Sequence, residues 1–366
     1  MKYQSRLLVI FVFILKLCNF PGFLSQEINS VHKNLAYYTG TQESYASLQA
    51  FSDQLDMLSI DVFAVQDDGS IAGSDDLGAA DYAFAHGIAA YVCVSNYRGE
   101  PLYDFDPALA RAAILTHRDT FIDELVTIAG DQRYAGVNID LESIAFSDDI
   151  EADRAAFTAF IQELDARLHA LDKQLIISVP AKSVESPDDD WAYPFDLAAL
   201  GQAADYLQLM TYDQHGPWSE PGPVAGLDWV EETTAYAAEL VDPAKLLLGL
   251  PAYAYDWDLA AYQAGAEDAV GELYWRDLPE LLALPGVQVG RDPDADSPYL
   301  SYRVNGDEHV VWYEDAASIR AKAALVGRYK LGGLAVWALG QEDASFWQAV
   351  TSGIKPIEQT ATFASN

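Results

Sequence analysis

The sequence predicts an α/β fold, a (β/α)8 TIM barrel with a small α+β insertion between its seventh and eighth strands. Short apolar runs alternate with amphipathic helical stretches along most of the chain, which is typical of βαβ units and a parallel sheet. Eight such runs occur in 366 residues, and eight parallel strands in about 250 residues or more are characteristic of this barrel. A doubly wound open sheet is the alternative, but no Gly-rich phosphate loop follows the first strand. The predicted strands are 34–39, 57–65, 88–95, 136–142, 175–180, 206–212, 246–251 and 334–339.

The N-terminus, residues 1–25, has the pattern of a signal peptide. Lys2 and Arg6 precede an uninterrupted apolar run from Leu7 to Leu15, and residues 23–25 offer a cleavage site. The run is too short to span a bilayer comfortably. We therefore expect a secreted or periplasmic protein with no membrane attachment after cleavage, and an uncleaved N-terminal anchor is the alternative. The barrel domain is predicted over 26–354, followed by a loose C-terminal tail over 355–366.

The charge of the chain excludes two classes of partner. The formal net charge is −35, and such a surface repels nucleic acid and anionic lipid. We expect neither as a partner, and we expect a monomer. The two cysteines are Cys18, in the leader, and Cys93, in an apolar strand pattern. These two cysteines predict no disulfide framework, and Cys93 is predicted to be a small core residue.

Three helices have clear sequence signals. Residues 106–129 begin with Asp-Pro, a good cap and first-turn pair, and end near Gly130. Residues 151–171 carry an apolar stripe at helical spacing. Asp315 can cap a helix that ends near Tyr329.

The connection between the seventh and eighth strands is about eighty residues long, far more than a usual βα loop. Residues 255–313 contain a short helical stretch at 278–284 and strand-like runs at 287–289, 299–303 and 309–313. Asn305-Gly306 between the last two runs is a hairpin signal. These patterns predict the small α+β insertion.

The fourth predicted strand carries the main chemical signal. Successive side chains of a strand point to opposite faces, so its polar residues share one face: Asn138, Asp140 and Glu142. Burying a carboxylate costs free energy unless the group is hydrogen-bonded, so buried carboxylates are often ones that take part in the protein's function. Two neighbouring carboxyl groups also push their pKa values apart, so one can keep a proton near neutral pH and act as a general acid. A purely structural carboxylate pair is the alternative.

Residues 134–142, Tyr-Ala-Gly-Val-Asn-Ile-Asp-Leu-Glu, resemble the signature Asp-Gly-x-Asp-x-Asp-x-Glu of glycoside hydrolase family 18. This family contains chitinases and related β-N-acetylglucosaminidases. Ala135 and Asn138 depart from the two leading Asp residues, and the Asn variant resembles the spore-cortex-lytic branch. The resemblance implies that Glu142 is the catalytic acid/base and that Asp140 orients the N-acetyl group of the substrate. We expect the amide of Asn138 to donate a hydrogen bond to Asp140.

Two further segments carry the same resemblance. Met210-Thr211-Tyr212-Asp213 is similar to the family's Met-x-Tyr-Asp motif, which implies that the Tyr212 hydroxyl contacts the N-acetyl carbonyl with Met210 and Asp213 beside it. Residues 333–340 resemble the closing segment, in which Trp337 forms the floor under the reacting sugar. Each aromatic residue can instead be core. Weaker candidates for substrate binding lie at or near strand ends: Tyr37, Asn96, Gln208 and Tyr253.

The resemblance implies a secreted glycosidase that cleaves β-1,4 linkages in N-acetylglucosamine-containing polymers by a retaining, substrate-assisted mechanism. No cofactor is implied. The six His residues are scattered without ligand spacing, so we expect no metal. A catalytically weak or silent chitin-binding lectin of the same fold is the alternative, and a barrel that binds a protein partner is a second one. Chitin and peptidoglycan both remain open as substrates.

Overall fold

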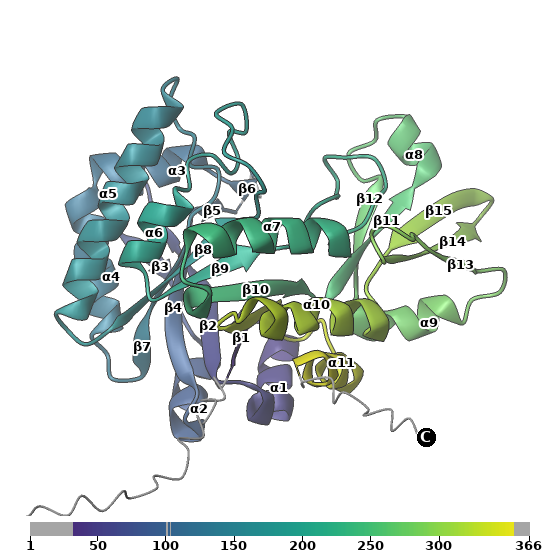
Figure 1. The fold of residues 1–366 in the computed structure, drawn as a ribbon, viewed down its shortest axis with the longest axis horizontal. Coiled ribbons are helices and arrows are strands. Elements are labelled where there is room, and N and C mark those ends of the chain that lie inside the picture. Colours follow the sequence, from purple (N-terminus) through teal and green to yellow (C-terminus); the bar gives the residue numbers. More distant parts are fainter. Residues whose placement is uncertain (1–31, 100–101, 103, 355–366) are drawn as a thin grey trace, which may run out of the picture. The chain divides into compact units, whose positions relative to one another are not determined.

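Eight parallel strands form a closed barrel (Figure 1). Each strand pairs with the next one along the barrel, and the first pairs with both its neighbours: Leu35 lies opposite Met57, and Asn34 lies opposite Leu334. Closure confirms the predicted barrel and excludes the open sheet. The strands are β1 (Lys33–Tyr38), β2 (Met57–Val65), β4 (Ala89–Ser95), β7 (Tyr134–Asp140), β8 (Gln174–Pro180), β9 (Tyr206–Met210), β10 (Leu246–Pro251) and β16 (Gly333–Trp337).

The computed structural model describes residues 32–99, 102 and 104–354. The expected signal peptide (1–25) and the C-terminal tail (355–366) lie outside this part of the chain. Among the described residues, no helix combines the length and apolar character needed to cross a bilayer.

The two faces of the barrel strands have different roles. In β7, Val137 and Ile139 are fully buried in the large apolar cluster that joins the strands to the surrounding helices. Side chains of the opposite face point into the barrel, where a smaller apolar cluster contains Tyr37, Cys93 and Ile176. Cys93 is buried and free there. The period-2 alternation of β7 therefore directs Asn138 and Asp140 inward.

Three strands end two residues earlier than the sequence predicts. β7 ends at Asp140 instead of 142, β9 at Met210 instead of 212, and β16 at Trp337 instead of 339. The chain bends away from the sheet just beyond, because Ser143 and Asp213 have φ values of 52° and 60°, a left-handed conformation that interrupts strand pairing. Glu142 and Tyr212 consequently lie on loops at the C-terminal edge of the barrel.

Helices surround the barrel (Figure 1). The stretch predicted as one helix over 106–129 is broken into α3, a π-helical turn over 112–116, and α4, because His117 leaves the helical region at φ −125° and ψ 28°. The Asp106 side chain caps α3, and Asp315 caps α10 in a capping box with Ser318, as predicted. The helices are α1 (Gln42–Phe51), α2 (Ala79–His86), α3 (Pro107–Arg111), α4 (Arg118–Ala129), α5 (Ile150–His169), α6 (Leu197–Ala203), α7 (Leu227–Leu240), α10 (Ala316–Tyr329) and α11 (Ala344–Ile354).

The connection between β10 and β16 folds into an antiparallel sheet, which confirms the predicted insertion. Asn305 and Gly306 both have positive φ, 54° and 107°, as a two-residue hairpin turn matching the strand twist requires. Its strands and helices are β11 (Tyr253–Asp258), α8 (Leu259–Gln263), β12 (Val270–Tyr274), α9 (Leu278–Leu282), β13 (Gln288–Arg291), β14 (Pro298–Val304) and β15 (Asp307–Trp312). Two short pairings were not predicted: β3 (Ile71–Gly73) on β2, and a hairpin of β5 (Tyr97–Arg98) with β6 (Asp104–Phe105).

Candidate active site

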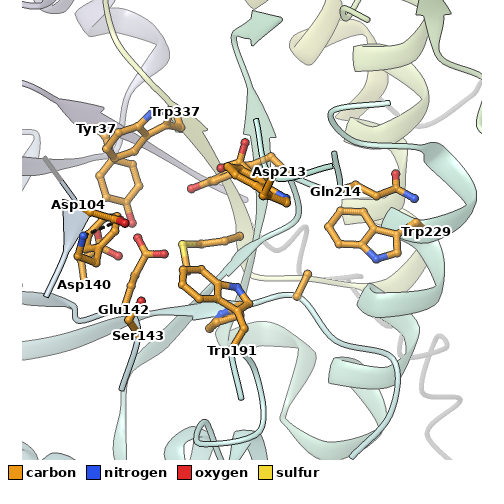
Figure 2. A pocket seen from close by; sticks show the side chains of 16 residues that line it. Tyr37, Asp104, Asp140, Glu142, Ser143, Trp191, Asp213, Gln214, Trp229 and Trp337 are labelled. Atoms are coloured by element: carbon orange, nitrogen blue, oxygen red, sulfur yellow. Dashed lines mark hydrogen bonds between the residues drawn. The ribbon is translucent and has the colours of Figure 1, made fainter. Parts of the chain in front are cut away.

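A cavity of about 640 Å³ opens at the C-terminal ends of the barrel strands (Figure 2). Catalytic residues of such barrels gather at this face. Seven of the side chains singled out from the sequence line the cavity: Tyr37, Asp140, Glu142, Met210, Tyr212, Asp213 and Trp337. Nine other lining residues were not identified from the sequence: Asp104, Phe105, Ser143, Pro180, Ala181, Trp191, Gln214, Trp218 and Trp229.

Glu142 is held at the cavity by its main chain. Its N–H donates to Asn96 Oδ1 at 2.8 Å, and its carbonyl oxygen accepts from Asn96 Nδ2 at 2.7 Å. Asn96 follows β4 directly and is fully buried, so a neighbouring barrel strand fixes the position of Glu142 beyond the end of β7. Figure 2 shows the Glu142 carboxyl group pointing into the cavity.

The environment of Glu142 favours its protonated form. The side chain is only 9% exposed. Burial raises the pKa of the Glu142 carboxyl well above its usual range, and the negative charges of Asp140 and Asp213 raise the pKa further. A carboxyl group that keeps a proton near neutral pH and faces a cavity is equipped to act as a general acid.

Asp140 is the last residue of β7, two residues before Glu142, and its side chain points into the barrel. It is 5% exposed, and its Oδ1 has no hydrogen-bond partner among the described residues. Burial raises the pKa of Asp140 to about 6, opposed by a hydrogen bond from Ser178. Both carboxyl groups therefore have raised pKa values, and the two can divide the roles of anion and acid.

Asn138 lies deeper and does not contact Asp140 as expected. Its amide donates to Tyr37 Oη at 2.9 Å and to Ser59 Oγ at 2.8 Å instead. Tyr37 Oη also lies 2.9 Å from Ser178 Oγ and donates to Gln208 Oε1 at 3.2 Å. Asn138 and Asp140 are neighbours on one strand face. Both contact Ser178, whose hydroxyl donates to Asn138 Oδ1 at 3.3 Å and also bonds Asp140, but no hydrogen bond joins Asn138 to Asp140.

The Tyr212 hydroxyl remains a donor over the neutral range. Burial, followed by the charge of Asp140, raises the pKa of Tyr212 well above its usual value. Next to it, Asp213 Oδ1 accepts from Tyr253 Oη at 2.5 Å and from Tyr255 Oη at 3.0 Å. Both tyrosines belong to β11, so the insertion fixes one wall of the cavity. Burial raises the pKa of Asp213, while these two hydrogen bonds lower it.

Aromatic rings form the floor and the rim of the cavity. Trp337 packs on Tyr37 with ring centroids 5.2 Å apart. Trp191, Trp218 and Trp229 line the outer part, and Trp218 is 63% exposed. Apolar ring faces suit the C–H faces of sugars. Trp191 and Trp218 lie in the loops after the fifth and sixth barrel strands, and Trp229 lies in the first turn of α7. An aromatic residue shortly after the C-terminal end of a strand is the signal that can point to them in the sequence.

Four of the sequence-derived candidates do not line the cavity: Asn96, Asn138, Gln208 and Tyr253. All four are buried. Each makes a hydrogen bond to a lining residue: Asn96 to Glu142, Asn138 and Gln208 to Tyr37, and Tyr253 to Asp213. The structure therefore places them in a supporting layer beneath the cavity surface.

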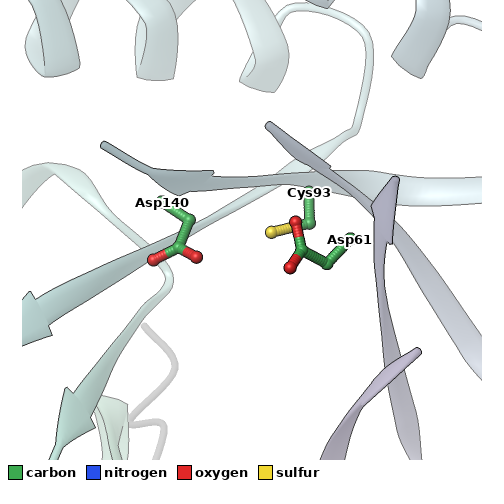
Figure 3. A group of neighbouring side chains, drawn as sticks. All are labelled: Asp61, Cys93 and Asp140. Carbon is green, nitrogen blue, oxygen red and sulfur yellow. The ribbon is translucent and has the colours of Figure 1, made fainter. Parts of the chain in front are cut away.

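A cluster of possible metal ligands lies below Asp140 (Figure 3). One ligand atom from each of Asp61, Cys93 and Asp140 lies within 4.8 Å of the other two. Sequence spacing does not reveal this cluster, because its members come from three different strands. The expectation that the protein has no metal stays a prediction.

The fold and the cavity together define a glycosidase: a β/α barrel whose C-terminal face presents a buried acid, a second carboxylate and an aromatic floor. The sequence model of "Glycosyl hydrolases family 18" matches residues 34–342, and the chain belongs to this family. The resemblance derived from residues 134–142 is thereby confirmed.

Relatives of known sequence or structure span most of the chain. The "Uncharacterized glycosylase YvbX" of Bacillus subtilis (strain 168) is 34% identical over 332 residues, which cover 90% of this chain and 93% of that protein. A chitinase from Chromobacterium violaceum is similar in structure, with a TM-score of 0.81, 38% identity, and coverage of 89% and 99%. The spore cortex-lytic enzyme SleL of Bacillus megaterium gives a TM-score of 0.78 at 25% identity, with coverage of 88% and 74%.

Proposed function

We propose that this protein is a secreted glycosidase that cleaves β-1,4 linkages in polymers containing N-acetylglucosamine. The observation that carries the proposal is Glu142: a buried carboxyl group with a raised pKa, directed into an aromatic-floored cavity and adjacent to Asp140. Membership of family 18 supports the same chemistry, and the similar proteins include a chitinase and a spore cortex-lytic enzyme.

The proposed mechanism is retaining and substrate-assisted, an exception to the usual pair of protein carboxylates. Glu142 protonates the glycosidic oxygen, and the acetamido oxygen of the sugar attacks the anomeric carbon as the glycosidic C–O bond breaks. The leaving sugar departs with a free hydroxyl group, and an oxazolinium ion remains. Asp140, as the anion, stabilises the positive charge that develops on the acetamido group, while the Tyr212 hydroxyl hydrogen-bonds its oxygen. Glu142, now a base, then takes a proton from water, which opens the ring with overall retention.

The charge of the cavity favours a neutral substrate. Four lining side chains carry carboxyl groups, Asp104, Asp140, Glu142 and Asp213, and the described lining includes no Lys, Arg or His. Peptidoglycan carries carboxylates on its muramic acid units and peptides, which this lining repels. We therefore place chitin and its oligomers before peptidoglycan as the substrate.

Digestion of three polymers tests the proposal. Chitin oligosaccharides, purified peptidoglycan and cello-oligosaccharides are incubated with the purified protein, and the products are identified by mass spectrometry. We expect cleavage of chitin oligosaccharides, slower or no cleavage of peptidoglycan, and none of the cello-oligosaccharides, which lack the acetamido group. Efficient cleavage of cello-oligosaccharides contradicts substrate assistance, and preferential cleavage of peptidoglycan contradicts the substrate order.

Secretion and the monomeric state are parts of the same proposal. The support for export is Lys2 and Arg6 followed by the apolar run up to Leu15. Expression of the full chain in a bacterial host, followed by N-terminal sequencing of the protein outside the cytoplasm, is expected to find a chain that starts near residue 26. Size-exclusion chromatography with light scattering is expected to give one chain per particle. A chain that stays in the cytoplasm with residues 1–25 still attached contradicts the proposed export. A stable dimer contradicts the proposed monomeric state.

A further inference from the structure

Asp61 brings a second carboxyl group to Asp140 from another strand. Asp61 lies on β2 opposite Cys93 of β4, and Cys93 lies opposite Asn138 of β7. The three side chains Asp61, Cys93 and Asp140 converge inside the barrel, with one oxygen or sulfur atom of each within 4.8 Å of the others. Figure 3 shows the Asp61 carboxyl group next to the Cys93 thiol, with the Asp140 carboxyl group on the same side.

Asp140 is buried and Asp61 is partly exposed, and two carboxyl groups at this separation cannot both be ionised at low cost. No cation compensates them, because the other titratable groups facing the pair within the described residues are Tyr37 of β1, Cys93 of β4, and Glu142, Tyr212 and Asp213 beyond β7 and β9. In addition, Asp140 Oδ1 is buried without a hydrogen-bond partner. A proton on one of the two carboxyl groups relieves this repulsion.

We propose that Asp61 is a positioning residue for the reaction: it holds one proton beside Asp140, so that the pair carries a single negative charge and this charge resides on Asp140. The inference rests on the proposed function of the cavity. It assigns a task to a residue that lies outside the family signature, on the strand two positions away from β7 in the barrel order. Asn138 stands where the signature has a carboxyl group, and Asp61 supplies the second carboxyl group from the other side.

The directions of the two pKa shifts agree with this assignment. Burial and the charge of Asp140 raise the pKa of Asp61 to about 7, while a hydrogen bond with the Cys93 thiol lowers it. Burial raises the pKa of Asp140 to about 6. Both carboxyl groups therefore resist ionisation, and Asp140 is the one of the two that lines the cavity. The two groups interact closely, so they titrate as a pair with two apparent pKa values.

The proton shared by Asp61 and Asp140 affects the two carboxyl groups that act in the cavity, Asp140 as the anion and Glu142 as the acid. When the acetamido oxygen attacks, positive charge develops next to Asp140, and the proton stays on Asp61, so the pair neither gains nor loses a proton. At higher pH, Asp61 also ionises, and its charge raises the pKa of Glu142. The pair thus helps Glu142 to remain an acid as pH rises.

The pH dependence of kcat/KM on a soluble chromogenic chitobioside tests the role of Asp61. In Asp61→Asn, Asp140 still has an uncharged neighbour in the pH range where it ionises, whereas Glu142 loses the negative charge that Asp61 gains at higher pH. We therefore expect the acidic limb to stay in place and the basic limb to move to lower pH by roughly one pH unit. Asp119→Asn, the same change at an exposed position of α4, is the matched control and should keep the wild-type limbs. A profile of Asp61→Asn that is only scaled down, with both limbs in place, overturns the proposal.

A second measurement does not depend on activity. Infrared difference spectra are recorded between pH 5 and 9 for Glu142→Gln and for the double variant Asp61→Asn/Glu142→Gln, so that the Glu142 proton is absent from both. We expect the single variant to show one more protonated carboxyl group, lost near pH 7, than the double variant, in which Asp140 still titrates. Identical bands in both variants overturn the assignment of the proton to Asp61. If no chitin substrate is cleaved, the proposed function fails, while this spectrum still decides where the proton lies.

Discussion

Asn96 binds Glu142 through both main-chain groups of that residue. Its amide oxygen accepts from the Glu142 N–H at 2.8 Å, and its amide nitrogen donates to the Glu142 carbonyl oxygen at 2.7 Å. The same amide nitrogen also donates to Asp106 O at 3.0 Å, which ties the loop before α3 to the same point. Glu142 lies just beyond the end of β7, yet its N–H and its carbonyl oxygen are both hydrogen-bonded, as they would be inside the sheet.

Replacing Asn96 with Ala should reduce turnover more than stability alone explains. The change leaves two buried main-chain groups of Glu142 unpaired, at about 1–3 kcal/mol each, and lets the acid move. We expect kcat to fall roughly 10–100-fold with a smaller effect on KM. Asn34→Ala is the control, because Asn34 also donates an amide hydrogen bond, to Gln54 O at 2.8 Å, at the opposite end of a barrel strand. Equal losses of kcat in both variants at matched folded fractions contradict the positioning role.

Tyr212→Phe should impair catalysis while the fold remains intact. The hydroxyl of Tyr212 keeps its proton because burial raises its pKa, and a donor aimed at developing charge is typically worth about 10²-fold or more in kcat. We expect a loss of about that size in kcat. Tyr302→Phe in the insertion removes a comparable hydroxyl that bonds Asp256 Oδ2 and should leave kcat unchanged. If Tyr212→Phe keeps the wild-type kcat, the Tyr212 hydroxyl takes no part in the reaction.

Trp218→Ala should affect long substrates selectively. Trp218 is 63% exposed at the rim of the cavity, where it can stack on sugars beyond the cleavage point. Loss of one such contact corresponds to about 0.5–1.5 kcal/mol beyond area burial. We expect KM to rise several-fold for chitin hexamers and to remain unchanged for a chitobioside. Phe84→Ala, at an exposed aromatic residue of α2, is the control. An equal KM change for both substrate lengths contradicts the rim assignment.

Glu142→Gln should stabilise the protein at alkaline pH. The pKa of Glu142 is raised in the folded state, so the unfolded chain releases this proton at lower pH than the folded chain does. Wild-type stability therefore declines as pH rises above the unfolded value of about 4.3, and continues to decline up to the folded pKa. Gln does not ionise, so the Tm advantage of the variant should grow from pH 4.5 to pH 8. A constant Tm difference over this range contradicts the buried, protonated state of Glu142.

The alternation of β7 is the reason that much of the site can be predicted from sequence. Because a strand alternates faces strictly, Asp140 is directed into the barrel wherever its apolar neighbours Val137 and Ile139 pack outward. The parallel arrangement of the barrel strands brings their C-terminal ends to one edge. Sequence patterns are weaker where the backbone leaves regular structure: Ser143 and Asp213 adopt positive φ, which shortens two strands, and His117 breaks a helix that periodicity predicts as continuous.

The residues that sequence reasoning missed depend on contacts between strands and loops. Asp61 is a single acid in an apolar strand pattern, and only the lateral order β2, β4, β7 brings it to Asp140. Trp191 and Trp218 follow the ends of β8 and β9, which the sequence does show, but the paths of these loops bring the two rings to the cavity, and no local pattern specifies those paths. Asn138 was expected to reach Asp140, and only the barrel packing shows that Tyr37 and Ser59 are nearer partners.

The most direct test of the account is the turnover of Glu142→Gln on a chromogenic chitobioside, measured together with the binding of a chitin oligosaccharide by calorimetry. Gln keeps the size and hydrogen-bonding shape of the side chain but cannot transfer a proton, so we predict a fall in kcat of roughly 10⁴-fold, the upper end for general acid–base catalysis, with binding retained. Glu163→Gln, at a surface ion pair with Arg118, should keep wild-type activity. Turnover of Glu142→Gln within a few-fold of the wild type would contradict the assignment of Glu142 as the acid/base.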